Sequence, residues 1–160
     1  MQKLISYPIS IVYYLCFGLT LVVFHPIQWI CFHVFGYQAH KKSVDYLNFF
    51  LVRCTNLLGT TYKFENIESI PKNVPLIFVS NHQSMYDIVA MIWFFRRFHC
   101  KFVSKKELGK GIPSVSFNLR HGGSVLIDRK DSKQAIPAIK GLAEYIEKNN
   151  PVLVNRGVAA

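Results

Sequence analysis

The most constraining feature of this 160-residue sequence is a long segment without charged side chains near its amino terminus. Between Lys3 and Lys41 there is no aspartate, glutamate, lysine or arginine. The run from Ile5 to Phe24 is almost continuously apolar or aromatic. At about 1.5 Å per residue, its roughly 20 residues match a hydrocarbon core about 30 Å thick. This segment therefore predicts a helix embedded in a membrane.

Two topologies remain open where this apolar run ends. His25-Pro26 interrupts the pattern, and the apolar run that follows, from Ile27 to Tyr37, is too short to span a bilayer comfortably. In a bent hairpin, Lys3 and the Lys41-Lys42 pair would both lie in the cytoplasm, because positive residues mark the cytoplasmic side. In a single span, one of these two ends would lie outside.

A cleaved signal peptide fits this segment less well than a membrane anchor. Such a peptide should end in a cleavage site of small residues, whereas His25-Pro26-Ile27 follows the apolar run. We therefore predict that residues 1–40 form a membrane helix or a helical hairpin. Residues 41–160 should form one further domain, because the chain has room for about one.

The charge of the chain predicts an anionic partner. The formal net charge is +10 and the isoelectric point is near 9.6, which implies attraction to nucleic acid, acidic headgroups or a phosphorylated substrate. The sequence contains no nucleic-acid-binding motif that we recognise, and the long apolar segment argues against that class. The four cysteines are scattered without a Cys-x-x-Cys pair and suggest neither a disulfide framework nor a zinc site.

Residues 41–160 alternate between helical and strand patterns. Apolar residues recur at helical spacing from Ser43 to Leu58, where Gly59 provides a stop. Later runs with β-branched residues are bounded by turn residues. Strands that alternate with helices indicate an α/β fold with a largely parallel sheet flanked by helices. The predicted strands are 60–64, 75–79, 100–103, 125–127 and 152–154, and the predicted helices are 43–58, 84–95, 114–120 and 132–148.

A histidine stands directly after a predicted buried strand, where open α/β sheets usually bind ligands. Pro75 to Val79 forms this strand, Ser80-Asn81-His82 follows it, and Asp87 lies five residues after His82. On one regular helix these two side chains would point about 140° apart. A carboxylate in the first helical turn could instead reach back to a histidine in the preceding loop. The carboxylate would then fix the imidazole tautomer and leave the other nitrogen as a general base.

A structural interpretation of Asp87 competes with this catalytic one. Ser84-Met85-Tyr86-Asp87 fits a capping box, with Ser84 as the N-cap and Asp87 three residues later. A single histidine is also more often structural than catalytic. Both interpretations remain open on these residues alone, and the rest of the chain favours the catalytic one.

Positive charge is concentrated between Arg96 and Lys133, with ten lysines and arginines against three acidic residues. Within this region, Lys105 follows one predicted strand and Arg129 lies just past another. A guanidinium at such a position could bind a phosphate through two hydrogen bonds, with the lysine as a second positive charge. For any single lysine, a solvated basic surface is the alternative interpretation.

Three blocks of the sequence together resemble the glycerolipid acyltransferases, especially those that act on 1-acylglycerol 3-phosphate. Asn81 to Asp87 is similar to the His-x4-Asp motif of that family, and Lys105 to Leu108 to its Lys-x-Glu-Leu segment. Gly123 to Arg129 is similar to its second block, which ends in Ile-Asp-Arg. The resemblance covers roughly Pro8 to Val154, including the N-terminal membrane helix. One His-x4-Asp alone would be weak, but three blocks in order are fairly specific.

The resemblance implies a reaction and a role for each matched residue. A fatty acyl group would pass from acyl-CoA or an acyl-carrier-protein thioester to lysophosphatidic acid, without a metal or other cofactor. The active site would lie at the surface of a membrane, in contact with its phospholipids, and would face the cytoplasm. His82 would be the general base with Asp87 as its partner, Lys105 and Arg129 would contact the substrate phosphate, and the supporting residues would be Asn81, Ser84, Glu107 and Gly123.

The sequence departs from this family after its last predicted strand. In the family, the strand that corresponds to Pro151 to Val154 should continue into Phe-Pro-Glu-Gly-Thr-Arg, whose Glu and Arg help to form the acceptor site. Here Asn155-Arg156-Gly157 follows. We therefore expect a partial acyltransferase α/β domain over residues 41–160, with the C-terminal part of the family fold missing and activity absent or impaired. The alternative from another class is a noncatalytic membrane protein that binds anionic lipid through its basic surface.

Overall fold

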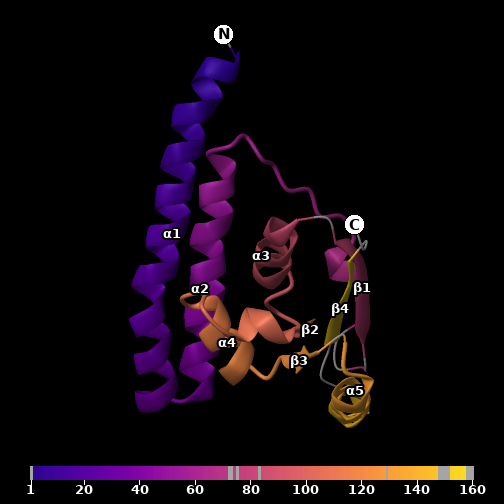
Figure 1. The fold of residues 1–160 in the computed structure, drawn as a ribbon. Helices are drawn as coiled ribbons and strands as arrows, with labels where there is room; N and C mark the ends of the chain where they lie inside the picture. The colour runs from indigo at the N-terminus through magenta and orange to yellow at the C-terminus, as the bar shows by residue number, and fades with distance from the viewer. Residues whose placement is uncertain are drawn as a thin grey trace.

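The computed structural model describes residues 2–71, 74, 76–82, 84–128, 130–147 and 152–157. Two long helices, α1 (Gln2–Val34) and α2 (Tyr37–Asn56), lie side by side as a hairpin. The helix α3 (Met85–Phe94) lies between this hairpin and a parallel sheet (Figure 1).

The first helix continues through both of its prolines, Pro8 and Pro26. An 18-residue window within Ser6 to Val34 has a mean hydropathy of 1.9, and within the described chain α1 is the one helix long and apolar enough to cross a membrane. The interruption predicted at His25-Pro26 is therefore wrong. The chain reverses instead at Gly36, whose φ of +81° suits glycine.

A contact from a distant part of the chain supports the helix at Pro26. A proline has no N–H and disturbs the hydrogen bonds of the preceding helical turn. The carbonyl oxygen that loses its helical donor is that of Val22, and the adjacent Leu21 carbonyl oxygen accepts a hydrogen bond of 2.6 Å from the Ser114 hydroxyl. The His25 ring nitrogen Nδ1 accepts one of 3.1 Å from the Ser114 N–H. Because Ser114 is fully buried, its loop covers α1 where the proline weakens the helix.

The hairpin and α3 share a hydrophobic core. Leu47, Leu51 and Val52 of α2 are buried against Val89 of α3. Burying one such side chain contributes about 1.5 to 3 kcal/mol, so this core fixes the hairpin to the rest of the domain. The helix predicted over residues 43–58 is confirmed, although it begins earlier, at Tyr37. Partly buried side chains around this core are Phe17, Leu21, Phe24, Tyr62 and Trp93.

In the described chain, four parallel strands form a sheet in the order β1-β4-β2-β3. They are β1 (Ile77–His82), β2 (Lys101–Lys105), β3 (Val125–Ile127) and β4 (Val152–Gly157). β4 pairs with all of β1 and with the start of β2, and β2 pairs with β3. The predicted α/β fold with a largely parallel sheet is thus confirmed. The strand that comes last in the chain lies inside the sheet.

The connections between the strands are helical, as the sequence predicts. The turn η2 (Lys106–Gly109) and the helix α4 (Val115–His121) lie between β2 and β3, and α5 (Ser132–Glu147) lies between β3 and β4. Figure 1 shows α4 next to the hairpin and α5 far from it, below the sheet. The hairpin therefore approaches the sheet from the side of α3 and α4.

One predicted strand does not form. Residues 60–64 have no regular secondary structure, and their side chains contact α2 and α3 instead. The Tyr62 hydroxyl lies 2.8 Å from the Thr55 hydroxyl, and the rings of Phe64 and Phe94 stack with centroids 4.1 Å apart. A strand needs a neighbouring strand to satisfy its backbone groups. These contacts place the segment against helices, where no such partner is available.

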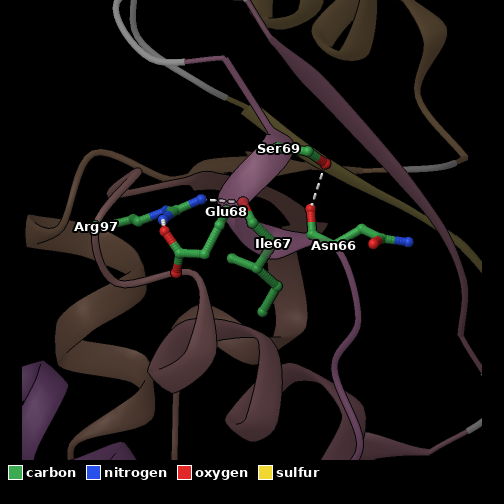
Figure 2. Close-up of polar contacts among 5 residues, drawn as sticks. All are labelled: Asn66, Ile67, Glu68, Ser69 and Arg97. Carbon is green, nitrogen blue, oxygen red and sulfur yellow. Dashed lines mark hydrogen bonds and ion pairs between the residues drawn. The ribbon is translucent and has the colours of Figure 1, made fainter.

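The chain then forms a short turn, η1 (Ile67–Ser69), that is attached to the end of α3 (Figure 2). Arg97 donates one hydrogen bond of 2.6 Å to the Glu68 carboxylate and another to the Ile67 carbonyl oxygen. The Ser69 hydroxyl donates to the Asn66 carbonyl oxygen at 2.7 Å. These bonds fix the position from which the chain proceeds toward β1.

Candidate active site at the carboxyl edge of the sheet

Three strands end at the same edge of the sheet with residues identified from the sequence. β1 ends at His82, and β2 ends at Lys105. Lys105 is in register with Ile127, the last residue of β3, and Asp128 follows directly. Parallel pairing brings these residues from distant parts of the chain to one edge. Open α/β sheets bind ligands outside this carboxyl edge, so it is the candidate active site.

The start of α3 forms the predicted capping box. Ser84 is the N-cap, and its Oγ accepts a hydrogen bond of 3.3 Å from the Tyr86 N–H. The Asp87 carboxylate oxygen Oδ2 accepts one of 2.9 Å from the Ser84 N–H. Asp87 is therefore in the first turn of α3, five residues after the end of β1 at His82.

Capping does not by itself exclude a catalytic role for Asp87. A carboxylate offers about four acceptor positions on its two oxygens, and the bond to Ser84 uses one of them. His82 is placed at the end of β1, but its side chain lies outside the described residues. The pairing of His82 with Asp87 therefore stays a prediction.

Three further predicted residues are exposed near this edge. Asn81 precedes His82 in β1, Lys105 ends β2, and Glu107 belongs to η2. Arg129, the second predicted phosphate contact, lies outside the described residues. Among the described side chains, no three histidines, cysteines or acidic residues converge as metal ligands would. At this edge a carboxylate can exchange protons, and the lysine ammonium can attract a phosphate.

The described residues on either side of position 129 make hydrogen bonds that the sequence pattern did not predict. Gln134 Oε1 accepts a hydrogen bond of 2.8 Å from the Asp128 N–H, and its Nε2 donates to the Leu126 carbonyl oxygen at 3.2 Å. Asp131 caps the start of α5. The spacing of Asp131 and Gln134, which is that of a capping box, was the available signal. The glutamine instead ties the start of α5 to the end of β3.

The opposite edge of the sheet carries a buried polar cluster that no sequence motif indicated. Lys101, the first residue of β2, is only 3% exposed. Its ammonium donates to the Tyr37 hydroxyl and to the Gly122 carbonyl oxygen at 2.6 Å, and it lies 3.0 Å from His99 Nε2. Burial, assisted by the charge of Lys41, lowers the pKa of Lys101 to about 8. We call Lys101, Tyr37, His99 and Gly122 the Lys101 cluster.

Gly123, predicted as a supporting residue of the active site, lies beside the Lys101 cluster. Its φ is +82°, and a Cβ at this position would lie 3.2 Å from Lys101 Cε. The close approach and the backbone conformation both favour glycine. Gly123 precedes β3, so it lies at the edge opposite His82 and Lys105.

The apolar helix α1 contacts the His82–Asp87 motif directly. The ring centroids of Tyr13 and Phe17 lie 5.8 and 6.0 Å from that of Tyr86, both in edge-to-face geometry. Such pairs add about 0.5 to 1.5 kcal/mol beyond the area that they bury. The four-residue spacing of these aromatic side chains on α1 was the available signal. α1 therefore helps to position the first turn of α3, which contains Asp87.

Comparison with protein families and relatives gives a consistent result. A family model described as Acyltransferase matches residues 61–155, more than half of the chain. Over 95 residues, the chain is 35% identical to the 1-acyl-sn-glycerol-3-phosphate acyltransferase of Helicobacter pylori strain J99, covering 59% of this chain and 39% of that protein. Over 89 residues, it is 30% identical to the chloroplastic 1-acyl-sn-glycerol-3-phosphate acyltransferase LPAT1 of Arabidopsis thaliana, covering 55% and 24%. The matches thus span at most 39% of these relatives' length.

A solved structure shares the fold. The chain superimposes on PlsC, the 1-acyl-sn-glycerophosphate acyltransferase of Thermotoga maritima, with a TM-score of 0.69 and 23% sequence identity. The similarity covers 97% of this chain and 61% of PlsC. The helical hairpin and the parallel sheet therefore recur together in that enzyme's fold.

Proposed function

Because this chain belongs to the acyltransferase family, we propose that it transfers a fatty acyl group from a thioester to a lysophospholipid hydroxyl. The acceptor that we propose is 1-acylglycerol 3-phosphate, which would give phosphatidic acid in phospholipid biosynthesis. The names of both relatives specify this acceptor. The observation that carries the proposal is the position of His82 and Asp87 at the carboxyl edge, within the matched residues 61–155.

In this proposal His82 is the general base, and Asp87 holds its imidazole in one tautomer. One imidazole nitrogen accepts the proton of the acceptor hydroxyl while the hydroxyl oxygen attacks the thioester carbonyl carbon. A carbon–oxygen bond forms, the carbon–sulfur bond breaks, and the departing thiolate takes up the proton from His82. The reaction needs no covalent enzyme intermediate and no metal.

Lys105 and Arg129 would bind the phosphate of the acceptor. The register of the two strands supports this pairing, because Lys105 is opposite Ile127 and Arg129 is two residues further on. A lysine and an arginine close together provide two charges and a guanidinium that can bind phosphate oxygens through two hydrogen bonds. The donor would be acyl-CoA or an acyl-carrier-protein thioester.

We also propose that residues 1–40 anchor residues 41–160, the acyltransferase domain, at the membrane with the active site in the cytoplasm. Support comes from the apolar helix over residues 6–34, whose outward side chains such as Leu15 and Val22 are exposed.

The chain reverses at Gly36, so Lys3 and Lys42 lie near opposite ends of α1. Contacts from Tyr13 to Tyr86 and from Leu21 to Ser114 attach this helix lengthwise to the domain, so we propose that it lies along the cytoplasmic surface of the membrane. Both Lys3 and Lys42 should then react with a membrane-impermeant amine reagent from the cytoplasmic side. Reaction at only one end would indicate a single span. Release of the protein by high salt alone would contradict the anchor.

The catalytic proposal is tested by replacing the base. The 160-residue chain and a chimera extended with the C-terminal region of Thermotoga PlsC are expressed at matched membrane levels. Phosphatidic acid formation is then measured from a labelled acyl thioester. In the chimera, His82→Ala should lower the rate by about 100- to 10,000-fold without changing thermal unfolding. The matched control is His33→Ala, which removes an exposed histidine of α1.

Two outcomes would contradict the proposal. Full activity of His82→Ala would remove the proposed base. Lipid binding without thioester-dependent acylation in either form would favour the noncatalytic alternative. The comparison of the two forms also tests whether Asn155-Arg156-Gly157 can replace the family's Phe-Pro-Glu-Gly-Thr-Arg block.

A further inference from the structure

An open groove of about 460 Å³ lies between α2, α3 and the segment that follows α2. None of the predicted active-site residues lines it. Its size is within the range of small-ligand sites, about 300 to 1,000 Å³. The residues used below are Phe49, Arg53, Asn56, Thr60, Tyr62, Trp93 and Phe94, all of which line the groove.

Hydrogen bonds hold the walls of this groove in place. The Asn56 amide, oriented so that its nitrogen donates, bridges the carbonyl oxygens of Val52 and Thr60 at 3.1 Å each. The Tyr62 hydroxyl lies 2.8 Å from the Thr55 hydroxyl. These bonds attach the 59–62 segment to α2. The segment that was predicted as a strand therefore forms one wall of the groove.

Aromatic rings form the opposite wall and support a cation. The rings of Phe49 and Trp93 lie 4.9 Å apart, and the Arg53 guanidinium lies 5.1 Å from the Phe49 ring centroid. A second guanidinium, that of Arg96, stacks on the Trp93 indole at 4.1 Å. Arg53 is exposed, and no carboxylate of the described residues forms an ion pair with it. The groove therefore combines an apolar wall with a positive charge that is available to a ligand.

The rim of the groove faces an apolar surface. Phe50 and Leu57, about one turn before and after Arg53 on α2, are 47% and 50% exposed. α2 packs along α1, whose outward face is apolar and long enough to cross a bilayer. Arginine and tryptophan side chains are well suited to this boundary, because each combines an apolar surface with a polar group. Cys54, next to Arg53, lies 3.9 Å from Thr20 in the middle of the apolar part of α1 (Sγ to Oγ1). With α1 lying along the membrane surface, a lipid that contacts its outward face has its headgroup region close to α2.

We propose that this groove binds a membrane phospholipid with an anionic headgroup. Its phosphate contacts the Arg53 guanidinium, whose planar donors match phosphate oxygens. Its glycerol and first acyl carbons lie against Phe49, Trp93 and Phe94. The groove is too small for whole acyl chains, so these extend along the exposed apolar side chains of α2. This site is separate from the proposed acceptor site at the carboxyl edge.

The two tryptophans of the sequence allow a direct test of this proposal. In a Trp29→Phe background, Trp93 becomes the sole tryptophan, and it lines the groove. The full chain is placed in phosphatidylcholine vesicles that contain increasing fractions of phosphatidylglycerol with bromine on the first part of its acyl chains, or of phosphatidylcholine brominated in the same way. Bromine quenches tryptophan fluorescence on contact. We expect half-maximal quenching of Trp93 at a lower mole fraction of the anionic lipid.

Replacing Arg53 should remove this preference. Arg53→Gln should raise the half-quenching fraction of brominated phosphatidylglycerol about fivefold, as expected for one basic residue near a membrane surface. Lys63→Gln is the matched control, because it removes the same charge beside the groove wall from a side chain that is 86% exposed. It should leave the preference unchanged. Arg53→Lys, which keeps the charge without the planar fork, should lie between the wild type and Arg53→Gln.

Several results would overturn this inference. Equal quenching by the two brominated lipids would show that the groove does not select for charge. An equal loss in Lys63→Gln and Arg53→Gln would show that net charge alone attracts the lipid. Because the assay contains no thioester, its result is independent of acyl transfer, and His82→Ala should leave the quenching unchanged.

Discussion

The two ends of β2 carry the same type of side chain in opposite environments. Lys105, at the carboxyl end, is exposed beside the proposed active site. Lys101, at the amino end, is buried, and Tyr37, His99 and Gly122 surround its ammonium. The two lysines are four residues apart in one strand and both belong to the same basic stretch of sequence. Their different roles therefore depend on what the rest of the fold places around each end of the sheet.

This difference separates function from stability along one strand. A charge at the open carboxyl edge keeps its hydrating water and remains available to a phosphate. A charge at the closed amino edge loses water, so its hydrogen-bond acceptors must replace that water. Changes at the carboxyl edge should therefore affect substrate use, whereas changes at the amino edge should affect the free energy of unfolding. Substitutions at the two edges test this separation.

Among the charged side chains of the two edges, Arg129 should give the largest effect when it is replaced by alanine. In the chimera with the PlsC C-terminal region, use of 1-acylglycerol 3-phosphate should weaken by about 1.5 to 3 kcal/mol, or roughly 10- to 150-fold. Use of the thioester donor and thermal unfolding should change little. The measurement is kcat/KM for each substrate, varied separately. An equal loss for both substrates would indicate misfolding and would break the comparison.

Lys101 should make stability depend on pH. Its pKa falls from the ordinary 10.5 to about 8 on folding, so between these values the unfolded chain binds more protons and stability rises with pH. Relative to Lys101→Met, the wild type should gain about 2 kcal/mol in free energy of unfolding from pH 7 to pH 9.5. Burial raises the pKa of the neighbouring Cys100 to about 12, which lowers stability above pH 9. To a first approximation this opposing effect cancels, because both proteins contain Cys100.

Urea unfolding in detergent at several pH values measures this difference. Lys105→Met is the control at the other end of the strand, and its stability should follow that of the wild type across the same range. If Lys101→Met also followed the wild type, the amino edge would not hold a lysine with a lowered pKa. The contrast between the two ends of β2 would then lose its physical basis.

Lys105→Gln should give the smallest effect on stability. An exposed side chain away from special features usually changes the free energy of unfolding by no more than about 0.5 kcal/mol. Use of the phosphorylated acceptor should weaken at low salt and approach that of the wild type as salt screens the exposed charge. Denaturant unfolding and acceptor KM at two salt concentrations measure both effects. A large loss of stability would mean that Lys105, like Lys101, has a structural role.

Features that depend on local pattern can be predicted from the order of the amino acids. The uncharged run after Lys3 predicts the apolar helix, the alternation of helices and strands predicts the parallel sheet, and Ser84 and Asp87 predict the cap of α3. The order of the His-x4-Asp, Lys-x-Glu-Leu and Ile-Asp-Arg blocks indicates the family. In each case the signal lies within a few neighbouring residues or in their order along the chain.

Features that depend on distant partners become visible only in the folded chain. Helix α1 continues through Pro26 with support from Ser114, which contacts the preceding turn from 93 residues away. Residues 60–64 form no strand because α2 and α3 hold their side chains. Lys101 is buried because Tyr37 and the Gly122 turn close around it. A sequence pattern reports only local propensity and periodicity. Whether a residue is buried, and whether its polar groups are hydrogen-bonded, depends on which distant residues the fold places beside it.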